Sequence, residues 1–125
     1  MLRFVRLRDP RLKVAVDVAN GMATLYEPLL QALNIEMVPL FFGLDGNFPN
    51  HEANPLKPEN LRDLQRAVRE HGCALGLAFD GDADRAIMVD DQAAIVGADL
   101  VTALLAGPVL ERFPGRPIIY DIRSS

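Results

Sequence analysis

The acidic loop, residues 80–85 with the sequence DGDADR, holds the side chains of this chain that are best suited to chemistry. Its three carboxylates, Asp80, Asp82 and Asp84, occupy every second position. Two unit charges about 4 Å apart repel by roughly 4 kcal/mol at an effective dielectric constant near 20, so such a cluster usually has a cation to neutralise it. Oxygen ligands favour a hard cation, Mg²⁺ or Ca²⁺. The loop therefore predicts a divalent metal site. Arg85 adds a fixed positive charge beside it, which suits a site that binds phosphate.

Other interpretations of this loop are a solvated acidic turn, an EF-hand and a phosphatase site. A solvated turn is the commonest structure of a hexapeptide rich in Asp and Gly. An EF-hand is disfavoured, because Arg85 and Asp91 stand where its loop has Gly at position six and Glu at position twelve. A phosphatase of the haloacid dehalogenase type, with Asp80 as nucleophile, stays open, although Asp84 stands where its pattern has Thr or Val.

Apolar runs flank the acidic loop and indicate the elements that position it. The predicted strands cover 13–18, 35–42, 74–79 and 86–90, and the predicted helices cover 22–33 and 58–71. Strands that alternate with helices favour a parallel sheet covered on both faces. Ligands in such sheets bind beyond the carboxyl ends of the strands, which is where the acidic loop lies.

The pattern changes near the C-terminal end of the sequence. Residues 97–113 predict a helix with a break at Gly107–Pro108, and residues 117–122 predict a further strand. One helix and one strand cannot close a core alone. We therefore expect residues 1–96 to form the domain that carries the acidic loop, and residues 97–125 to be the incomplete start of a following α/β domain.

Composition narrows the class of protein. The chain has 125 residues and is half hydrophobic, which suits one folded core. A net charge of −4, with no basic stripe, argues against a nucleic-acid partner. No apolar run approaches the roughly 20 residues of a membrane span, and no signal peptide is visible in residues 1–8, which could instead finish a helix. The single Cys73 fits a core position and a reducing compartment, so we expect a cytoplasmic protein without a membrane partner.

Four stretches resemble the α-D-phosphohexomutases, the phosphomannomutase/phosphoglucomutase family. They are VDVANGMA at 16–23, DGNFPNHEANP at 45–55, FDGDADR at 79–85 and YDIRSS at 120–125. In order, they are similar to the first strand and turn of the family's second domain, its D-G-x-F-P-N-H-x-P-N-P loop, its metal-binding loop and the opening of its third domain. Ala53 replaces a Pro of the family pattern, and Arg123 replaces a Lys, which keeps the charge but changes the donor geometry.

The resemblance implies a fold and a set of functional residues. The fold is α/β, a three-layer α/β/α domain with a mixed, mainly parallel sheet. Asp80, Asp82 and Asp84 would each give an oxygen to Mg²⁺. Arg85 would be a catalytic residue that contacts phosphate beside the metal, and Arg123 would meet the hexose phosphate substrate.

The implied activity is an intramolecular phosphoryl transfer between the 6-phosphate and the 1-phosphate of mannose or glucose. It uses a phosphoserine enzyme and a bisphosphate intermediate. The only serines here, Ser124 and Ser125, do not match the family's phosphoserine loop. We therefore expect this chain to be part of a longer protein, to need the missing domains and to be inactive alone. A non-catalytic metal-binding or assembly module from a truncated product remains the alternative.

Two polar residues outside the acidic loop could also serve the site. His51 could be a general base, but a loop histidine that packs against its own turn is the favoured interpretation. Asp17 ends a predicted strand, where it could face the site or cap the turn before Asn20–Gly21.

Overall fold

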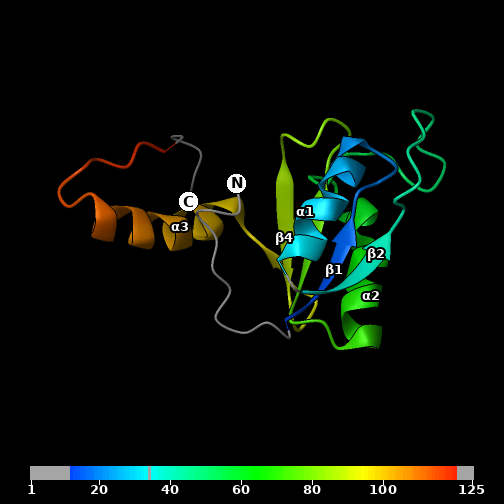
Figure 1. Cartoon of the computed structure of the whole chain (residues 1–125), viewed down its shortest axis with the longest axis horizontal. Helices are drawn as coiled ribbons and strands as arrows, with labels where there is room; N and C mark the ends of the chain where they lie inside the picture. The colour runs from blue at the N-terminus through cyan, green and yellow to red at the C-terminus, as the bar shows by residue number, and fades with distance from the viewer. Residues whose placement is uncertain (1–11, 34, 121–125) are drawn as a thin grey trace. The chain divides into compact units, whose positions relative to one another are not determined.

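The computed structural model describes residues 12–33 and 35–120, which contain five strands and five helices (Figure 1). The strands are β1 (Lys13–Asp17), β2 (Glu36–Leu40), β3 (Leu75–Phe79), β4 (Ala86–Asp90) and β5 (Ile95–Val96). The helices are the 3-10 helices η2 (Met22–Tyr26) and η3 (Pro58–Leu61) and the α-helices α1 (Glu27–Ala32), α2 (Arg62–His71) and α3 (Ala98–Arg112). The predicted helix end at residues 1–8 lies outside the described residues.

The five strands form one mixed sheet in the order β2-β1-β3-β4-β5. β1 is parallel to both β2 and β3, with Asp17 opposite Leu40 on one side and Ala78 on the other. β3 and β4 are antiparallel and pair Phe79 with Ala86. The carboxyl ends of β1, β2 and β3 therefore share one edge of the sheet, and the acidic loop closes the β3–β4 hairpin at that edge.

Alternate residues of β1 face two separate apolar clusters. Val14 and Val16 pack with Ala23 and the partly buried Tyr26 and Leu30, which belong to η2 and α1. Ala15, between the two valines, belongs to the cluster on the other face. A parallel strand buried on both faces is expected to be continuously apolar, and the three central residues of β1, Val14 to Val16, are.

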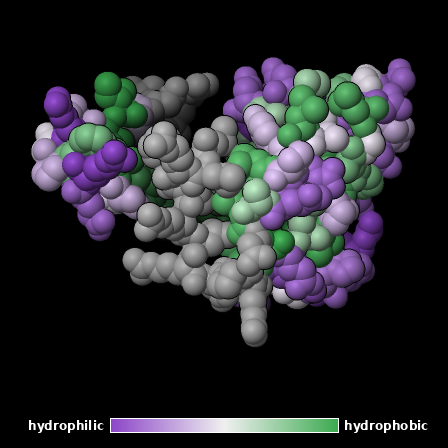
Figure 2. All heavy atoms as spheres, viewed as in Figure 1, coloured by the Kyte–Doolittle hydropathy of each residue, from purple (hydrophilic) through white to green (hydrophobic). Residues whose placement is uncertain are grey.

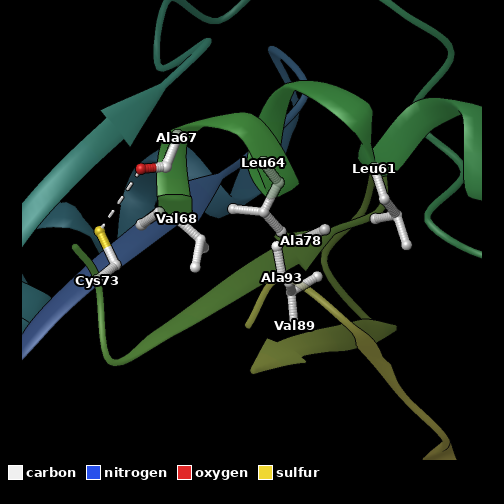
Figure 3. Packing of buried hydrophobic residues seen from close by; sticks show 9 residues of the cluster. Leu61, Leu64, Ala67, Val68, Cys73, Ala78, Val89 and Ala93 are labelled. Atoms are coloured by element: carbon white, nitrogen blue, oxygen red, sulfur yellow. Dashed lines mark hydrogen bonds between the residues drawn. The ribbon is translucent and has the colours of Figure 1, made fainter. Parts of the chain in front are cut away.

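The second cluster packs α2 against the sheet (Figure 3). Leu64 and Val68 lie one helical turn apart on the buried face of α2, and β3 and β4 contribute Ala78 and Val89. Cys73 is buried here, as the sequence predicted, with its Sγ 4.0 Å from the Ala67 carbonyl oxygen. Helices on both faces of a mixed sheet confirm the predicted three-layer α/β/α fold.

Both predicted long helices begin with a 3-10 segment. The segment predicted as one helix over 22–33 consists of η2 followed by α1. Pro28 lies in the first turn of α1, where its missing N–H leaves no hydrogen bond unmade, so a new helix can begin there. η3 likewise precedes α2 and begins at Pro58.

The chain divides into two compact units, Met1–Ile95 and Val96–Ser125. In the second unit α3 continues through Pro108, so the predicted break at Gly107–Pro108 is wrong. The backbone bonds from Val101 N to Gly97 O and from Phe113 N to Val109 O show helical turns on both sides of the proline, which removes only its own donor.

The predicted strand at 117–122 is also wrong as far as the structure describes it. Residues 117–120 have no regular structure, because a strand needs a neighbour for its backbone hydrogen bonds and this unit offers none among its described residues. Apolar side chains of this unit lie at its surface (Figure 2). They include Leu100, Leu104, Leu105, Val109 and Phe113 of α3 and its end. Within the described ranges, no helix combines the length and apolar character needed to cross a bilayer.

Candidate metal centre

The acidic loop is a tight hairpin connection whose backbone bonds to itself. Asp80 N donates to Arg85 O over 3.2 Å, and Ala83 N donates to Asp80 O over 3.2 Å. Ala83 adopts a left-handed conformation with φ 64°. This turn brings the three carboxylates round to one side, although they alternate in sequence.

Asp80, Asp82 and Asp84 each offer a carboxylate oxygen, and these oxygens lie within 4.8 Å of one another. Asp80 is buried, whereas the other two are exposed. The charges of Asp82 and then Asp80 raise the pKa of Asp84 above 3.8, which shows mutual repulsion across the cluster. Three carboxylate oxygens this close together fit a hard divalent cation such as Mg²⁺.

Arg85 holds Asp80 in place through both carboxylate oxygens. Its backbone N donates to Oδ1 over 3.1 Å, and its Nε donates to Oδ2 over 2.6 Å. Burial alone would raise the pKa of Asp80, but the two hydrogen bonds and the positive charge of Arg85 outweigh it and lower the pKa below 3.8. The ion pairs of Arg85 with described residues use only Nε, so the terminal nitrogens of its half-exposed guanidinium remain available to an anion.

The turn after β1 touches the acidic loop through two glycines. Met22 N donates to Gly81 O over 2.9 Å. A Cβ placed on Gly21 would lie 2.7 Å from Gly81 O and 3.0 Å from Gly81 Cα. Only glycine permits this approach of two backbones.

The long loop, residues 41–57 between β2 and η3, also packs against Gly81. A Cβ placed on Gly81 would lie 3.3 Å from Phe48 Cζ and 3.6 Å from Ala53 Cβ. Asn20 ties the long loop to the turn after β1: its Nδ2 donates to Gly43 O over 2.6 Å, and its Oδ1 accepts from Asn50 Nδ2 over 2.7 Å. The acidic loop is thus held between two segments that are distant in sequence.

Asp17 and His51 form a second link between the same segments. Asp17 Oδ1 accepts from Ala19 N over 2.8 Å, so Asp17 caps its turn, and its Oδ2 lies 3.0 Å from His51 Nε2. His51 Nδ1 lies 2.9 Å from Glu52 O, a contact within its own turn. Burial raises the pKa of Asp17, and in His51 the Glu52 carbonyl and Asp17 outweigh burial and raise its pKa above 6.5.

Sequence comparison identifies the domain that carries this site. The family pattern described as phosphoglucomutase/phosphomannomutase, alpha/beta/alpha domain II, matches residues 2–94. The chain belongs to the phosphoglucomutase/phosphomannomutase family. The predicted family resemblance is therefore confirmed.

Two relatives and one solved structure illustrate the match. The chain is 50% identical over 114 residues to a phosphomannomutase/phosphoglucomutase of Pseudomonas putida, covering 90% of the chain and 25% of that protein. It is 42% identical over 122 residues to a phosphoglucomutase of Neisseria gonorrhoeae, covering 97% and 26%. The crystal structure of a phosphoglucomutase/phosphomannomutase family protein from Burkholderia thailandensis superposes with a TM-score of 0.87 at 41% identity, covering 91% and 25%. The chain thus spans about a quarter of the length of these relatives.

Within this family domain, the structure brings four of the five predicted site residues together, namely Arg85 and the three aspartates. Arg123 lies outside the described residues. Sequence reasoning did not predict the Asp17–His51 pair or the contact between Gly21 and Gly81. The sequence singled out Asp17, His51 and the Asn20–Gly21 turn separately, but it did not indicate which of them meet, since pairing between distant loops leaves no periodic pattern.

Proposed function

We propose that this chain supplies the metal-binding loop of a phosphohexomutase, which interconverts the 6-phosphate and the 1-phosphate of mannose or glucose. The supporting observation is the convergence of three aspartate oxygens within 4.8 Å on a loop that also carries Arg85. This arrangement lies in a domain that matches the family's second domain.

Asp80, Asp82 and Asp84 would hold Mg²⁺. When bound, the metal offsets negative charge that develops on a transferring phosphoryl group. Arg85 keeps Asp80 ionised and orients it through Nε. Its terminal nitrogens can then donate to a substrate phosphate beside the carboxylates, and planar guanidinium donors match phosphate oxygens well.

The remaining parts of the reaction belong to the rest of a longer protein. A phosphoserine in another domain would exchange its phosphoryl group with the sugar through a bisphosphate intermediate. Arg123 would contact the hexose phosphate where a following domain begins, after residue 96. We place this enzyme in the cytoplasm, where a reduced thiol such as the buried Cys73 persists.

A phosphatase that uses Asp80 as nucleophile is not favoured. The Asp80 side chain is fully buried, and both of its oxygens accept hydrogen bonds from Arg85. A carboxylate that must attack phosphorus needs one accessible oxygen with a free path to the substrate.

The proposal is tested by supplying the missing domains in trans. The first, third and fourth domains of the Pseudomonas putida relative are mixed with this chain, Mg²⁺, glucose 1-phosphate and a catalytic amount of the 1,6-bisphosphate, and glucose 6-phosphate is followed. We expect turnover with this chain, none with Asp82→Asn and none with the chain alone. If the relative's own second domain restores activity and this chain does not, the proposed function is refuted.

A further inference from the structure

Phe48 and Ala53, which touch the acidic loop at Gly81, flank His51 in the sequence. His51 Nε2 in turn lies 3.0 Å from Oδ2 of Asp17, at the carboxyl end of β1. We propose that Asp17 and His51 are a buried positioning pair that seats the long loop on the acidic loop and thereby sets the spacing of the metal-binding carboxylates. The effect of this pair on metal affinity, which the first experiment below measures, rests on the proposed function.

The hydrogen bonds of His51 define its protonation. Glu52 O can only accept, so Nδ1 must carry a proton. The second contact, between Nε2 and Asp17 Oδ2, then needs one further proton between the two atoms. Either the His51 ring is an imidazolium that donates to the Asp17 carboxylate, or a neutral His51 ring accepts a hydrogen bond from a protonated Asp17. Both forms make the pair neutral overall, which suits its position, since only 1% of Asp17 and 15% of the His51 side chain are exposed.

The pair fastens the long loop at its middle. Asn50, next to His51, bonds to Asn20 over 2.7 Å, so two adjacent residues of the loop are tied to the turn after β1. The Phe41 ring, at the start of the same loop, packs edge-on against the His51 ring with centroids 5.2 Å apart. Movement of His51 would therefore carry Phe48 and Ala53 away from Gly81, and the acidic loop would lose this packing.

Charged groups from two neighbouring elements, α2 and the long loop, lie around the pair. From α2, the charge of Asp63 raises the pKa values of both Asp17 and His51, and Asp63 is itself paired with Arg66. From the long loop, Glu52 presents its backbone carbonyl to His51, while its side chain pairs with Lys57 over 2.6 Å. Asp17 is thus the only carboxylate among the described residues that hydrogen-bonds to His51.

Three variants of the full 125-residue chain separate positioning from a general loss of stability. His51→Leu removes both hydrogen bonds. His51→Gln keeps an amide N–H that can reach Asp17. Lys57→Gln is the matched control, because it breaks an exposed ion pair of the same loop without touching Asp17.

The first readout is Mg²⁺ affinity, from nuclear magnetic resonance titrations that follow the amides of Asp82 and Asp84. We expect His51→Leu to weaken binding by about 10-fold, the lower end of the loss typical for groups that orient metal ligands. His51→Gln should recover most of the affinity, and Lys57→Gln should match the wild type. A folded His51→Leu chain with wild-type affinity would overturn the proposal.

The second readout needs no metal, so it separates the failure of this inference from that of the proposed function. The amides of Met22, Asp80, Ala83 and Arg85 form the hydrogen bonds of the acidic loop and its neighbour. Their hydrogen exchange should be faster in His51→Leu than in Lys57→Gln. Equal rates would refute the positioning role, even if the wild-type chain binds no Mg²⁺.

A third measurement keeps the proposal falsifiable if His51→Leu does not fold. The ¹⁵N signals of the His51 ring in the wild type should show a protonated Nδ1 and a strongly hydrogen-bonded Nε2 at pH 7. Averaged signals of a ring that exchanges freely between its two neutral tautomers would show that the pair does not form. Asp17→Asn, which keeps the side-chain volume, then replaces His51→Leu in the exchange comparison.

Discussion

Replacing Gly21 by alanine should force apart the turn after β1 and the acidic loop. The new Cβ would lie 2.7 Å from Gly81 O and 3.1 Å from Val18 O. All the near atoms are backbone, so no side chain can rotate to make room. The φ of Gly21 is −92°, which alanine adopts without strain, so the effect comes from the overlap alone.

The size of the effect follows from two contributions. Forcing a methyl group into a packed site lowers the free energy of unfolding by roughly 1–3 kcal/mol. Moving the turn away also breaks the bond from Met22 N to Gly81 O, and a buried hydrogen bond contributes about 1 kcal/mol. A total of about 2–4 kcal/mol should lower the Tm of a domain of this size by roughly 10–30 °C.

Circular dichroism during thermal unfolding of the metal-free chain measures this difference. Gly43→Ala is the control, because a Cβ on Gly43 meets no atom within 4 Å. Removing an unstrained glycine makes the unfolded chain less flexible, so the control should be neutral or more stable by up to about 1 kcal/mol. If Gly21→Ala and Gly43→Ala unfold at the same Tm, the two backbones do not approach as described.

Three further outcomes are expected. Asp82→Asn should raise the Tm of the metal-free chain near pH 7, because the Asp82 charge is the largest cause of the raised pKa of Asp84. The gain should shrink as the pH falls through the pKa of Asp84 and that carboxylate loses its charge, and an unchanged or lower Tm at pH 7 would contradict this repulsion. The folded-state pKa of His51 is raised, so the stability from its pair with Asp17 should be complete below pH 6.5 and should decline as the pH rises through the folded-state pKa. A Tm difference between wild type and His51→Leu that grows at high pH would disprove this coupling. Limited proteolysis should cut first between Gly97 and Gly115 and leave a folded fragment with the acidic loop, because α3 buries none of its side chains. Equal protection of the α3 and β3 amides from hydrogen exchange would instead place both elements in one domain.

Periodicity predicted the layers of the fold because burial repeats along each element. The alternation around Ala15 in β1 and the helical spacing of Leu64 and Val68 in α2 both reflect which side chains face the core. The three aspartates were equally accessible to prediction, since all lie within a single loop of six residues.

The features that the sequence did not reveal depend on partners elsewhere in the chain. Residues 117–120 are apolar enough for a strand, but the described residues give them no neighbour to pair with. The Asp17–His51 pair joins residues 34 positions apart, and no local pattern encodes such a meeting. Left-handed backbone at Ala19 and Phe48, with φ of 46° and 49°, was equally hidden, because non-glycine residues seldom adopt it.

The order in which the partners of the acidic loop occur along the chain bears on how the loop would form during synthesis. Gly21, Phe48 and Ala53, which contact Gly81, all precede it in the sequence, as does β3. A ribosome would release these partners first, and folding during synthesis proceeds from the N-terminal side. Once β4 has emerged, each segment that holds the loop is present. The carboxylates would then be seated before residues 98–112 leave the exit tunnel, and the loop would be ready for a metal while the rest of the protein is still being made.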